Sequence, residues 1–244
     1  MRWLLTVLFV ISFSTALAAR DEISGQALVI DGGTLEIRNQ QIALAGLEAP
    51  DAAQTMPWPD GTLDLIGRGS ALVLRALTHG DTVRCKIVAT RSDEGLKAGI
   101  CILGDLELNA EMVARGQAWA KAEDGGLDYT AQELAARAAK LGVWRGPAER
   151  ASVFRARLWQ SALSSAPGGC PIKTIIDRNK DRFYILPWSP WYERIALDQN
   201  AAGRWFCKES VAREAGWRRP SFLMSSIVMG AYNPSQSQPA VDEK

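Results

Sequence analysis

Hydrophobic and polar residues alternate in short runs along the first half of the chain, a pattern typical of β-strands with one buried face. The alternation over residues 23–38 is broken by the turn signal Asp31-Gly32-Gly33 and therefore predicts a hairpin. A third apolar strand is expected over 41–47. Two further strands are expected over 81–88 and 99–103.

Apolar residues at helical spacing follow the third predicted strand. They span residues 66–78, and Gly80 follows as a C-terminal stop signal. A second helix is expected from an N-cap at Asn109, and a third from the capping box formed by Thr130 and Glu133. Three strands, a helix, two strands and two helices are the arrangement of a five-stranded OB-type barrel. The predicted fold class is therefore α+β, built on a β-barrel.

The composition changes after the predicted barrel domain, residues 22–146. Residues 147–169 combine a helical segment with a linker, and residues 170–220 hold four of the nine tryptophans. A module of this size has little core, so aromatic side chains and a disulfide are expected to stabilise it. Residues 221–244 form a tail that is expected to be disordered at its end.

Residues 1–18 have the pattern of a secretory signal peptide. Arg2 provides the positive start, residues 3–13 are almost continuously apolar, and Ala16-Leu17-Ala18 is a small-x-small cleavage site. An uncleaved N-terminal anchor is the alternative, although the apolar run is short for a bilayer. No later stretch is long and apolar enough to cross a membrane. We therefore expect an exported protein, periplasmic or extracellular.

The charge balance argues against two kinds of function. The net charge is +1, and removal of Arg2 with the signal peptide leaves the mature chain neutral. Tight nonspecific binding to DNA needs several cations that neutralise phosphates, so it is disfavoured. The single histidine, His79, lies at a predicted helix C-terminus, where a ring that can be cationic complements the helix dipole. We therefore do not expect a histidine-based or zinc site.

Four cysteines in an exported chain predict disulfides, and four thiols allow three connectivities. They lie as two sequence-local pairs, Cys85 with Cys101 and Cys170 with Cys207. The first pair falls on two consecutive strands of the predicted sheet. Closing such a loop would contribute roughly 3 kcal/mol in the chain-entropy model.

Four separated motifs, in order, give the predicted barrel a family resemblance. Together they resemble the hairpin, strand-end and helix motifs of the staphylococcal nuclease-like (thermonuclease) family over residues 24–146. The resemblance implies an OB-fold of the staphylococcal nuclease type. The motifs are residues 27–35, residues 42–51, residues 108–118, and the set Tyr129, Glu133, Ala136, Arg137, Gly142, Val143 and Trp144.

The resemblance also implies a site at the strand ends, and this chain departs from it at every position. In the family, two carboxylates hold Ca²⁺, a glutamate activates water and two arginines bind the scissile phosphate. Hard carboxylate oxygens suit Ca²⁺, and cations stabilise charge that develops on phosphorus. Here Gly33 and Glu48 stand at the two metal-binding positions, and Asp51 replaces the activating glutamate. Ala43 and Leu96 stand at the arginine positions.

These replacements predict a degraded active site. Loss of one transition-state cation or donor typically costs ~10²–10³-fold in rate, so loss of both arginines and a metal ligand should leave little activity. Asp31 and Asp51 remain as weak catalytic candidates and Glu48 as a weak metal ligand. Alternatively, Asp31 is a turn residue and the other two are solvated. Ca²⁺ is expected as a cofactor only if residual nuclease activity exists.

Residues 170–218 resemble a C-terminal extension of nuclease-like proteins from proteobacteria. Some proteins with this two-part layout are labelled as succinoglycan (exopolysaccharide) biosynthesis proteins. The resemblance implies a bacterial protein, and a disulfide is preferred to zinc because two cysteines cannot provide a four-cysteine site. The matching residues are Cys170, Ile172, Lys173, Tyr184, Pro187, Ser189, Tyr192, Arg194, Trp205, Phe206, Cys207, Ala215, Gly216, Trp217 and Arg218.

The aromatic residues of this extension have two interpretations. Trp188, Trp191 and Tyr192 stack on sugars or single-stranded bases, or they form the small core of the module. Three functions follow: a binding or scaffolding protein of the cell envelope, a residual metal-dependent phosphodiesterase acting on nucleic acid, and an interaction factor in exopolysaccharide production. The corresponding partners are polysaccharide, nucleic acid or an envelope protein.

Overall fold

The computed structural model describes residues 22–91, 93–122, 126–177, 179–195, 197 and 205–224. The predicted signal peptide and the tail after residue 224 lie outside the described residues. The first part of the chain forms β1 (Glu22–Asp31), β2 (Thr34–Ile37), β3 (Gln40–Leu44), β4 (Leu47–Glu48), β5 (Met56–Pro57), β6 (Leu63–Asp64), α1 (Ile66–Thr78), β7 (Thr82–Arg91), β8 (Leu96–Leu103), β9 (Leu106–Glu107), α2 (Leu108–Ala114), β10 (Trp119–Ala120), α3 (Thr130–Ala138) and the 3-10 helix η1 (Gly142–Arg145).

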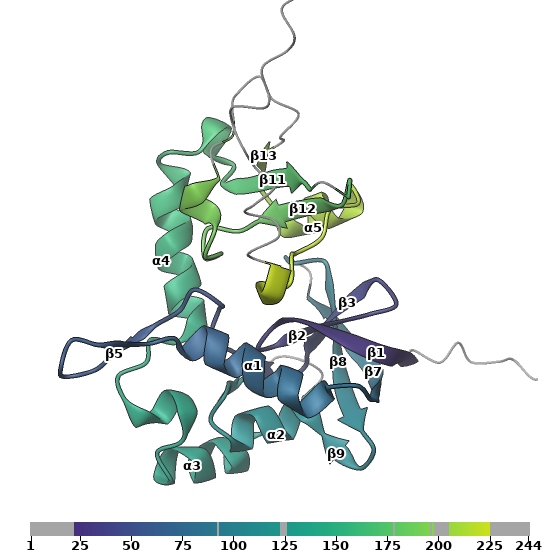
Figure 1. Cartoon of the computed structure of the whole chain (residues 1–244), viewed down its shortest axis with the longest axis vertical. Coiled ribbons are helices and arrows are strands. Elements are labelled where there is room, and N and C mark those ends of the chain that lie inside the picture. The colour runs from purple at the N-terminus through teal and green to yellow at the C-terminus, as the bar shows by residue number, and fades with distance from the viewer. Residues whose placement is uncertain are drawn as a thin grey trace, which may run out of the picture.

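Five of these strands close into a barrel, as the sequence predicts. Their order is β3-β2-β1-β7-β8, all antiparallel neighbours, and a parallel pairing of β3 with β8 completes the ring. The α+β class and the OB-like barrel are therefore confirmed, together with a C-terminal part that carries its own disulfide. In Figure 1, α1 crosses the barrel on the viewer's side, and α2 and α3 lie below it.

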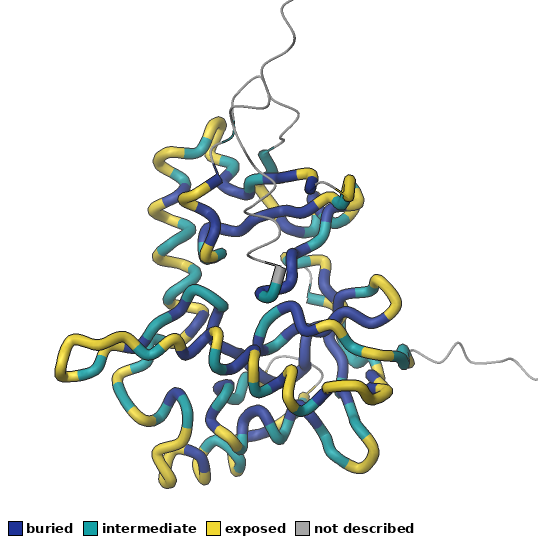
Figure 2. The backbone as a smooth tube through the Cα atoms, in the orientation of Figure 1, coloured by how far each residue is buried: buried dark blue, intermediate teal, exposed yellow. Residues whose placement is uncertain are grey.

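The barrel core is made by alternate residues of the strands and the inner face of α1. Leu35, Ile42 and Val83 are fully buried, and α1 adds Ala71 and Leu74. Figure 2 shows this buried backbone as a dark blue band through the barrel. Each large aliphatic side chain removed from water contributes roughly 1.5–3 kcal/mol. The helical prediction over 66–78 is confirmed to the residue.

The end of α1 also follows the prediction. His79 is the C-cap residue and is exposed, and Gly80 follows with a φ of 83°. This left-handed conformation is one that glycine adopts without steric cost, which is why the helix ends there.

Asn109 does not have its predicted N-cap role. The N-cap of α2 is Glu107, and Asn109 lies inside the first turn, fully buried. Its Oδ1 accepts the backbone N–H of Cys101 at 2.9 Å, and its Nδ2 donates to the carbonyls of Ala45 at 2.8 Å and Gly99 at 3.0 Å. A buried amide whose hydrogen bonds are all formed stabilises the fold more than an exposed N-cap does. These bonds connect the end of β3 to β8, where the barrel closes.

The predicted capping box of α3 is also wrong. Thr130 is the first helical residue, and the carboxylate of Asp128 accepts its backbone N–H at 2.9 Å. Glu133 turns away from the helix start: its Oε2 accepts the backbone N–H of Ala120 at 2.9 Å. The acid expected to cap a helix therefore holds β10 against α3.

The rest of the chain contains a small module with a three-stranded sheet of order β12-β11-β13. The disulfide between Cys170 and Cys207 joins the segment before β11 to the residue after β13. The bond between Cys85 and Cys101 links β7 to β8 in the barrel. The helices α4 (Ala151–Leu163) and η2 (Pro167–Gly169) precede the module. The module itself contains β11 (Ile172–Ile176), β12 (Arg182–Ile185), η3 (Tyr192–Arg194), β13 (Trp205–Phe206), α5 (Glu209–Glu214) and η4 (Phe222–Met224).

The module lies against the barrel, and its last described segment enters the barrel core. Phe222 belongs to the same buried cluster as the barrel strands, and Ser221 Oγ donates to the carbonyl of Val29 at 2.5 Å. Arg218 forms an ion pair with Glu36 of β2 at 2.7 Å. In Figure 1 the yellow turn of η4 lies between module and barrel. No helix in the described part of the chain is long and apolar enough to cross a membrane.

Candidate functional site

The structure brings the three predicted acidic site residues to one end of the barrel. Asp31 ends β1, Glu48 ends β4, and Asp51 follows β4 by three residues. Asp31 Oδ1 also accepts the N–H of Gly33 at 2.9 Å, so it has the turn role that the sequence offered as an alternative. Glu48 and Asp51 are buried, which excludes the solvated alternative for both.

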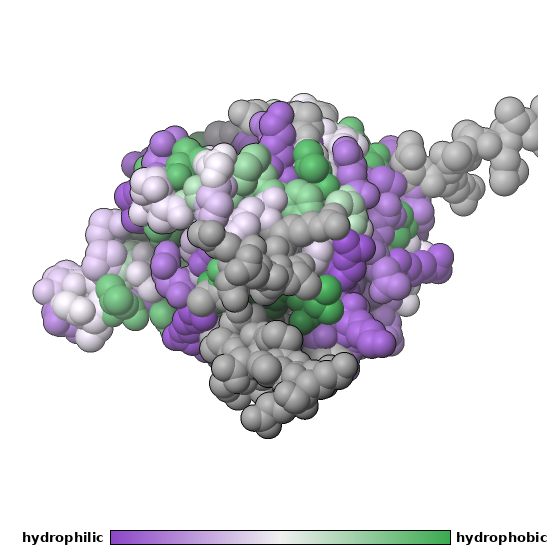
Figure 3. Space-filling view, turned by 90° about the horizontal axis from the view of Figure 1, so that it is seen from above, coloured by the Kyte–Doolittle hydropathy of each residue, from purple (hydrophilic) through white to green (hydrophobic). Residues whose placement is uncertain are grey.

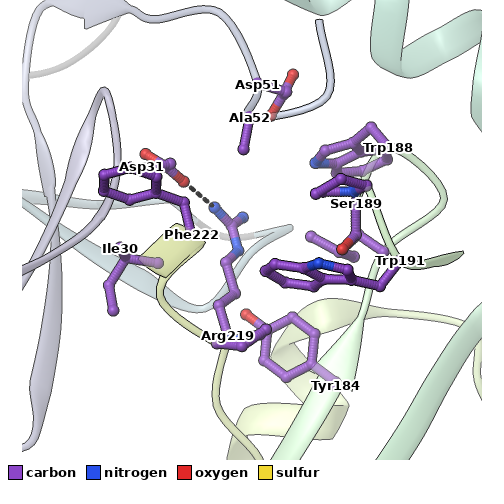
Figure 4. Close-up of a pocket in the computed structure, with 13 residues that line it drawn as sticks. Ile30, Asp31, Asp51, Ala52, Tyr184, Trp188, Ser189, Trp191, Arg219 and Phe222 are labelled. Carbon is purple, nitrogen blue, oxygen red and sulfur yellow. Dashed lines mark ion pairs between the residues drawn. The ribbon is translucent and has the colours of Figure 1, made fainter. Parts of the chain in front are cut away.

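Each of these three carboxylates is paired with an arginine from the chain beyond the barrel. Arg219 lies 3.6 Å from Asp31, Arg155 lies 2.8 Å from Asp51, and the third pair joins Glu48 to an arginine at 3.9 Å. That arginine, Arg150, is the N-cap residue of α4, and Arg155 lies in α4. Figure 4 shows the guanidinium of Arg219 directed at Asp31. The C-terminal part therefore neutralises the acidic end of the barrel.

Arg219 is the most constrained of these cations. It makes paired hydrogen bonds of 2.8–3.0 Å with the carboxylate of Glu209 in α5 and approaches Glu94 at 3.5 Å. Tyr184 O–H donates to the same Glu209 at 2.8 Å. Burial lowers the pKa of Arg219, but Glu209, Tyr184, Glu94 and Asp31 outweigh it and raise that pKa well above its ordinary value. Arg219 stays charged and tied to at least three carboxylates.

The same surroundings raise the pKa of Asp51 and lower the pKa of Glu94. Burial raises the pKa of Asp51 to about 6 against the attraction of Arg155. Burial also acts upward on Glu94, but Arg219 and Arg91 outweigh it and hold the pKa of Glu94 below its usual value. Arg91 Nη2 also donates to the carbonyls of Leu44 and Leu47 at 3.3 and 3.4 Å. Near neutral pH the cluster consists of fixed, opposite charges.

The two positions that hold arginines in the thermonuclease family lie in one apolar cluster. Ala43 is fully buried and Leu96 is 1% exposed, and both pack with Ala45 and Ala98. Lys97 is exposed, on the other face of β8 from Leu96, as predicted. A guanidinium at either buried position would lose its hydration.

Two small pockets remain at the strand ends, with free volumes of about 20 and 50 Å³, and neither has room for a substrate. The polar pocket there has a free volume of about 20 Å³, room for roughly one water molecule. Its lining is charged on nearly every side, and a phosphodiester could enter only if the ion pairs opened. The lining residues are Asp31, Gly33, Thr34, Leu47, Glu48, Ala49, Arg91, Glu94, Lys121, Arg155 and Arg219.

Ca²⁺, the metal implied by the family resemblance, does not fit these residues. Gly33 has no side-chain ligand, and Glu48 and Asp51 are each paired with a guanidinium. Within the described ranges, no group of three or more His, Cys, Asp or Glu side chains is placed to hold a metal ion. Ca²⁺ requires six to eight oxygen ligands, and here the nearby carboxylates already serve as ion-pair partners.

The predicted stacking residues divide into two groups. Trp191 and Tyr192 are 4% and 5% exposed and pack inside the module with Phe183 and Ile185. Trp188 is half-buried and lies beside Trp159 of α4, with 6.2 Å between ring centroids. The structure thus gives Trp191 and Tyr192 a core role and leaves Trp188 at a surface.

The arginine partners are the functional residues that sequence reasoning missed. Arg155 is 104 residues from Asp51, and Arg219 is more remote still from Asp31. Arginine is common on the surface of helices, as at Arg155, and in polar segments such as the one that contains Arg219. Nothing in the local sequence therefore distinguishes these two positions. Only covariation between the carboxylates and the arginines could have found them.

Fold and site together define a class: an OB-fold-like barrel whose strand ends are closed by its own disulfide-bearing C-terminal part. No family model matches the chain. The succinoglycan biosynthesis protein ExoI of Rhizobium meliloti (strain 1021) is 31% identical to it over 139 residues, which are 56% of this chain and 72% of that protein. The chain belongs to the family of this ExoI protein.

Proposed function

We propose that the chain is an exported, non-catalytic protein of thermonuclease-like descent that acts in exopolysaccharide production by binding and assembly. One observation carries the proposal: Asp31, Glu48 and Asp51 each have an arginine partner from beyond the barrel. A nuclease site must leave its carboxylates available to metal and water and its cations available to phosphate. Here guanidinium groups hold Asp51 and Asp31, and Glu48 has a looser ion pair with Arg150, which lies closer to Glu133.

The family supports the biological setting. The name of the ExoI relative refers to succinoglycan biosynthesis, and we extend that setting to this chain. Two disulfides are typical of an oxidising compartment outside the cytoplasm, and the signal-peptide pattern agrees with export. We retain a signal peptide at 1–18, a nuclease-like domain at 22–146, a helix and linker at 147–169 and a module at 170–220. We also retain a segment at 221–244, but its first residues, Ser221 and Phe222, pack into the barrel and are not a free tail.

A rewired phosphodiesterase is the second candidate. It is favoured by one observation: two guanidinium groups, those of Arg155 and Arg219, lie at the strand ends where the family places two arginines from other positions. Both are held by carboxylates, so the activity would require these pairs to open. The same variants therefore separate the two candidates.

Complementation tests the proposed function. In a strain that lacks the gene, Asp51→Asn should restore exopolysaccharide yield as well as the wild-type chain, because the role needs the fold and not an ionised Asp51. Asp105→Asn, at an exposed turn, is the matched control. Loss of yield with Asp51→Asn alone, in a variant that folds and is exported normally, would contradict a non-catalytic role and favour the rewired enzyme.

A further inference from the structure

A groove lies between the β7–β8 turn of the barrel, α4 and the start of α5, and it shares Glu94 and Arg155 with the strand-end pocket. We propose that this groove binds a neutral, β-linked glucose chain, which deepens the proposed exopolysaccharide role and rests on it. The groove has a volume of about 310 Å³, in the range of small-ligand sites. Its lining is Asp93, Glu94, Arg155, Trp159, Trp188, Cys207, Lys208 and Glu209.

Two indole rings form the apolar part of the groove. Trp159 of α4 and Trp188 lie with centroids 6.2 Å apart and planes inclined at 43°, and both are half-buried. A β-glucopyranose ring carries its hydroxyls equatorially and its C–H bonds axially, so each face is a flat apolar surface that matches an indole. Aromatic walls with a few fixed polar groups are the usual composition of a site for such a ligand.

The mouth of the groove supplies hydroxyl partners. Asp93 and Lys208 are exposed there, and neither forms an ion pair with another residue in the described part of the chain. Glu94, Glu209 and Arg155 lie deeper and are fixed by their own ion pairs. A carboxylate and an ammonium group at the mouth can accept from and donate to sugar hydroxyls, and the deeper charges hold the walls rigid.

The walls are also set by a close backbone contact. Gly95 has a φ of 61°, and a Cβ there would lie 3.0 Å from the Cα of Ser210 in α5. The β7–β8 turn therefore touches α5 directly, which places Asp93 and Lys208 on facing sides of one groove. A larger residue at position 95 would push these two sides apart.

The charges of the groove disfavour the other classes of ligand. Nucleic acid needs clustered cations, and the lining has only Arg155, which is held by Asp51, and Lys208 at the mouth. An apolar protein segment would desolvate the same charges. On the face shown in Figure 3, green and purple residues are interspersed around the parts drawn in grey, without one broad apolar patch. A neutral sugar chain can stack its C–H faces on the indole rings and form hydrogen bonds through its hydroxyls with Asp93 and Lys208.

Binding of cellotetraose, a neutral β-linked glucose tetrasaccharide, tests the proposal. We expect saturable binding of cellotetraose to the disulfide-intact chain by calorimetry, with a change in tryptophan fluorescence. Trp159→Ala should weaken binding by at least tenfold, Trp159→Phe should restore most of it, and Asp93→Asn should weaken it several-fold. Trp58→Ala, another half-buried tryptophan, is the matched control and should bind normally.

Three results would overturn the proposal: no binding of cellotetraose, binding unchanged in both Trp159→Ala and Asp93→Asn, or tighter binding of a dT₁₂ oligonucleotide that Trp159→Ala abolishes. The proposed function fails separately. If cellotetraose does not bind while Asp51→Asn still restores exopolysaccharide, only the groove assignment is wrong. If Asp51→Asn removes a metal-dependent cleavage activity, the non-catalytic role is wrong whatever the result with sugar.

Discussion

Arg155 donates through Nε to Oδ2 of Asp51 at 2.8 Å, and this bond joins α4 of the C-terminal part to the end of the barrel. The Asp51 side chain is 4% exposed and the Arg155 side chain 28%. By the resemblance to thermonucleases, Asp51 stands where a residue would orient a water molecule, and here its carboxylate is held in an ion pair internal to the chain. The pair binds the two parts of the molecule together and closes the site at once.

Breaking this pair from one side should cost substantial stability. Arg155→Met leaves Asp51 buried without its partner, and one-sided removal of a buried pair typically costs about 3–5 kcal/mol. The double variant Arg155→Met/Asp51→Asn should be less destabilised than the sum of the single variants, because it leaves no orphaned charge. Urea unfolding measures all three.

The matched control for this cycle is Arg115→Met. Arg115 pairs with Glu111 at 2.6 Å on the surface of α2, and exposed pairs are worth roughly 0–1 kcal/mol. Equal losses for Arg155→Met and Arg115→Met would show that the Asp51 pair does not hold the module to the barrel.

The raised pKa of Asp51 predicts a specific pH dependence. Burial moves this pKa from its ordinary 3.8 to about 6, so the folded protein binds a proton that the unfolded chain has released. The contribution of Asp51 to stability is therefore fully present below pH 3.8 and is lost as the pH rises through about 6. Asp51→Asn lacks this loss, so its stability relative to wild type should increase from pH 4 to pH 7 by up to about 3 kcal/mol.

Urea unfolding of both proteins at several pH values gives this difference, and other titrating groups cancel in the comparison. The ¹³C chemical shift of the Asp51 side-chain carboxyl, followed by NMR against pH, should show a titration midpoint near 6. A midpoint near 4, with a stability difference that does not change with pH, would mean that Asp51 is hydrated and that the site is open.

Calcium should not stabilise the protein. A ligand that binds only the folded state raises its stability by RT ln(1 + [L]/Kd), so a site with millimolar affinity would shift the melting temperature measurably at ~10 mM Ca²⁺. Because the three carboxylates are engaged by arginines, we expect no shift relative to an equal ionic strength of NaCl. A saturable shift that Glu48→Gln removes and Glu111→Gln retains would contradict this account.

The module disulfide should control access to the strand ends. Its cysteines are 37 residues apart, and a cross-link of that length contributes about 4 kcal/mol in the chain-entropy model. Cys170→Ser/Cys207→Ser should therefore loosen the module and increase hydrogen exchange around Asp51. Removal of the Cys85–Cys101 bond should destabilise the barrel by about 3 kcal/mol. It should increase hydrogen exchange first in β7 and β8, the two strands that the bond joins. The same exchange pattern for both pairs would show that module and barrel unfold as one unit.

The architecture of the barrel could be predicted because its signals are local. Alternation defined β1 and β2, helical spacing defined α1, and the turn signal Asp31-Gly32-Gly33 placed the first hairpin. These patterns indicate which face of each element is buried, and short turns place consecutive strands side by side in the sheet. The resemblance to thermonucleases places Ala43 and Leu96 at arginine positions, and the structure packs both side chains in an apolar cluster.

The closed site could not be predicted because it is made by long-range pairs. Asn109 and Glu133 have the composition of helix caps, but tertiary hydrogen bonds to Ala45 and Ala120 use their side chains instead. Trp159 carries no motif, and it becomes part of a groove only because α4 passes beside Trp188. Sequence patterns report local conformation, while the partners of a buried charge depend on how distant segments pack.

Whether the strand-end carboxylates are catalytic is tested by cleavage of single-stranded DNA and RNA by disulfide-intact residues 19–244, with Ca²⁺ or with a chelator. Asp51→Asn and Asp105→Asn would be assayed beside the wild-type chain. We predict no cleavage above background in any sample. Metal-dependent cleavage that Asp51→Asn abolishes and Asp105→Asn retains would contradict it, because the strand-end carboxylates would then be catalytic in spite of their arginine partners.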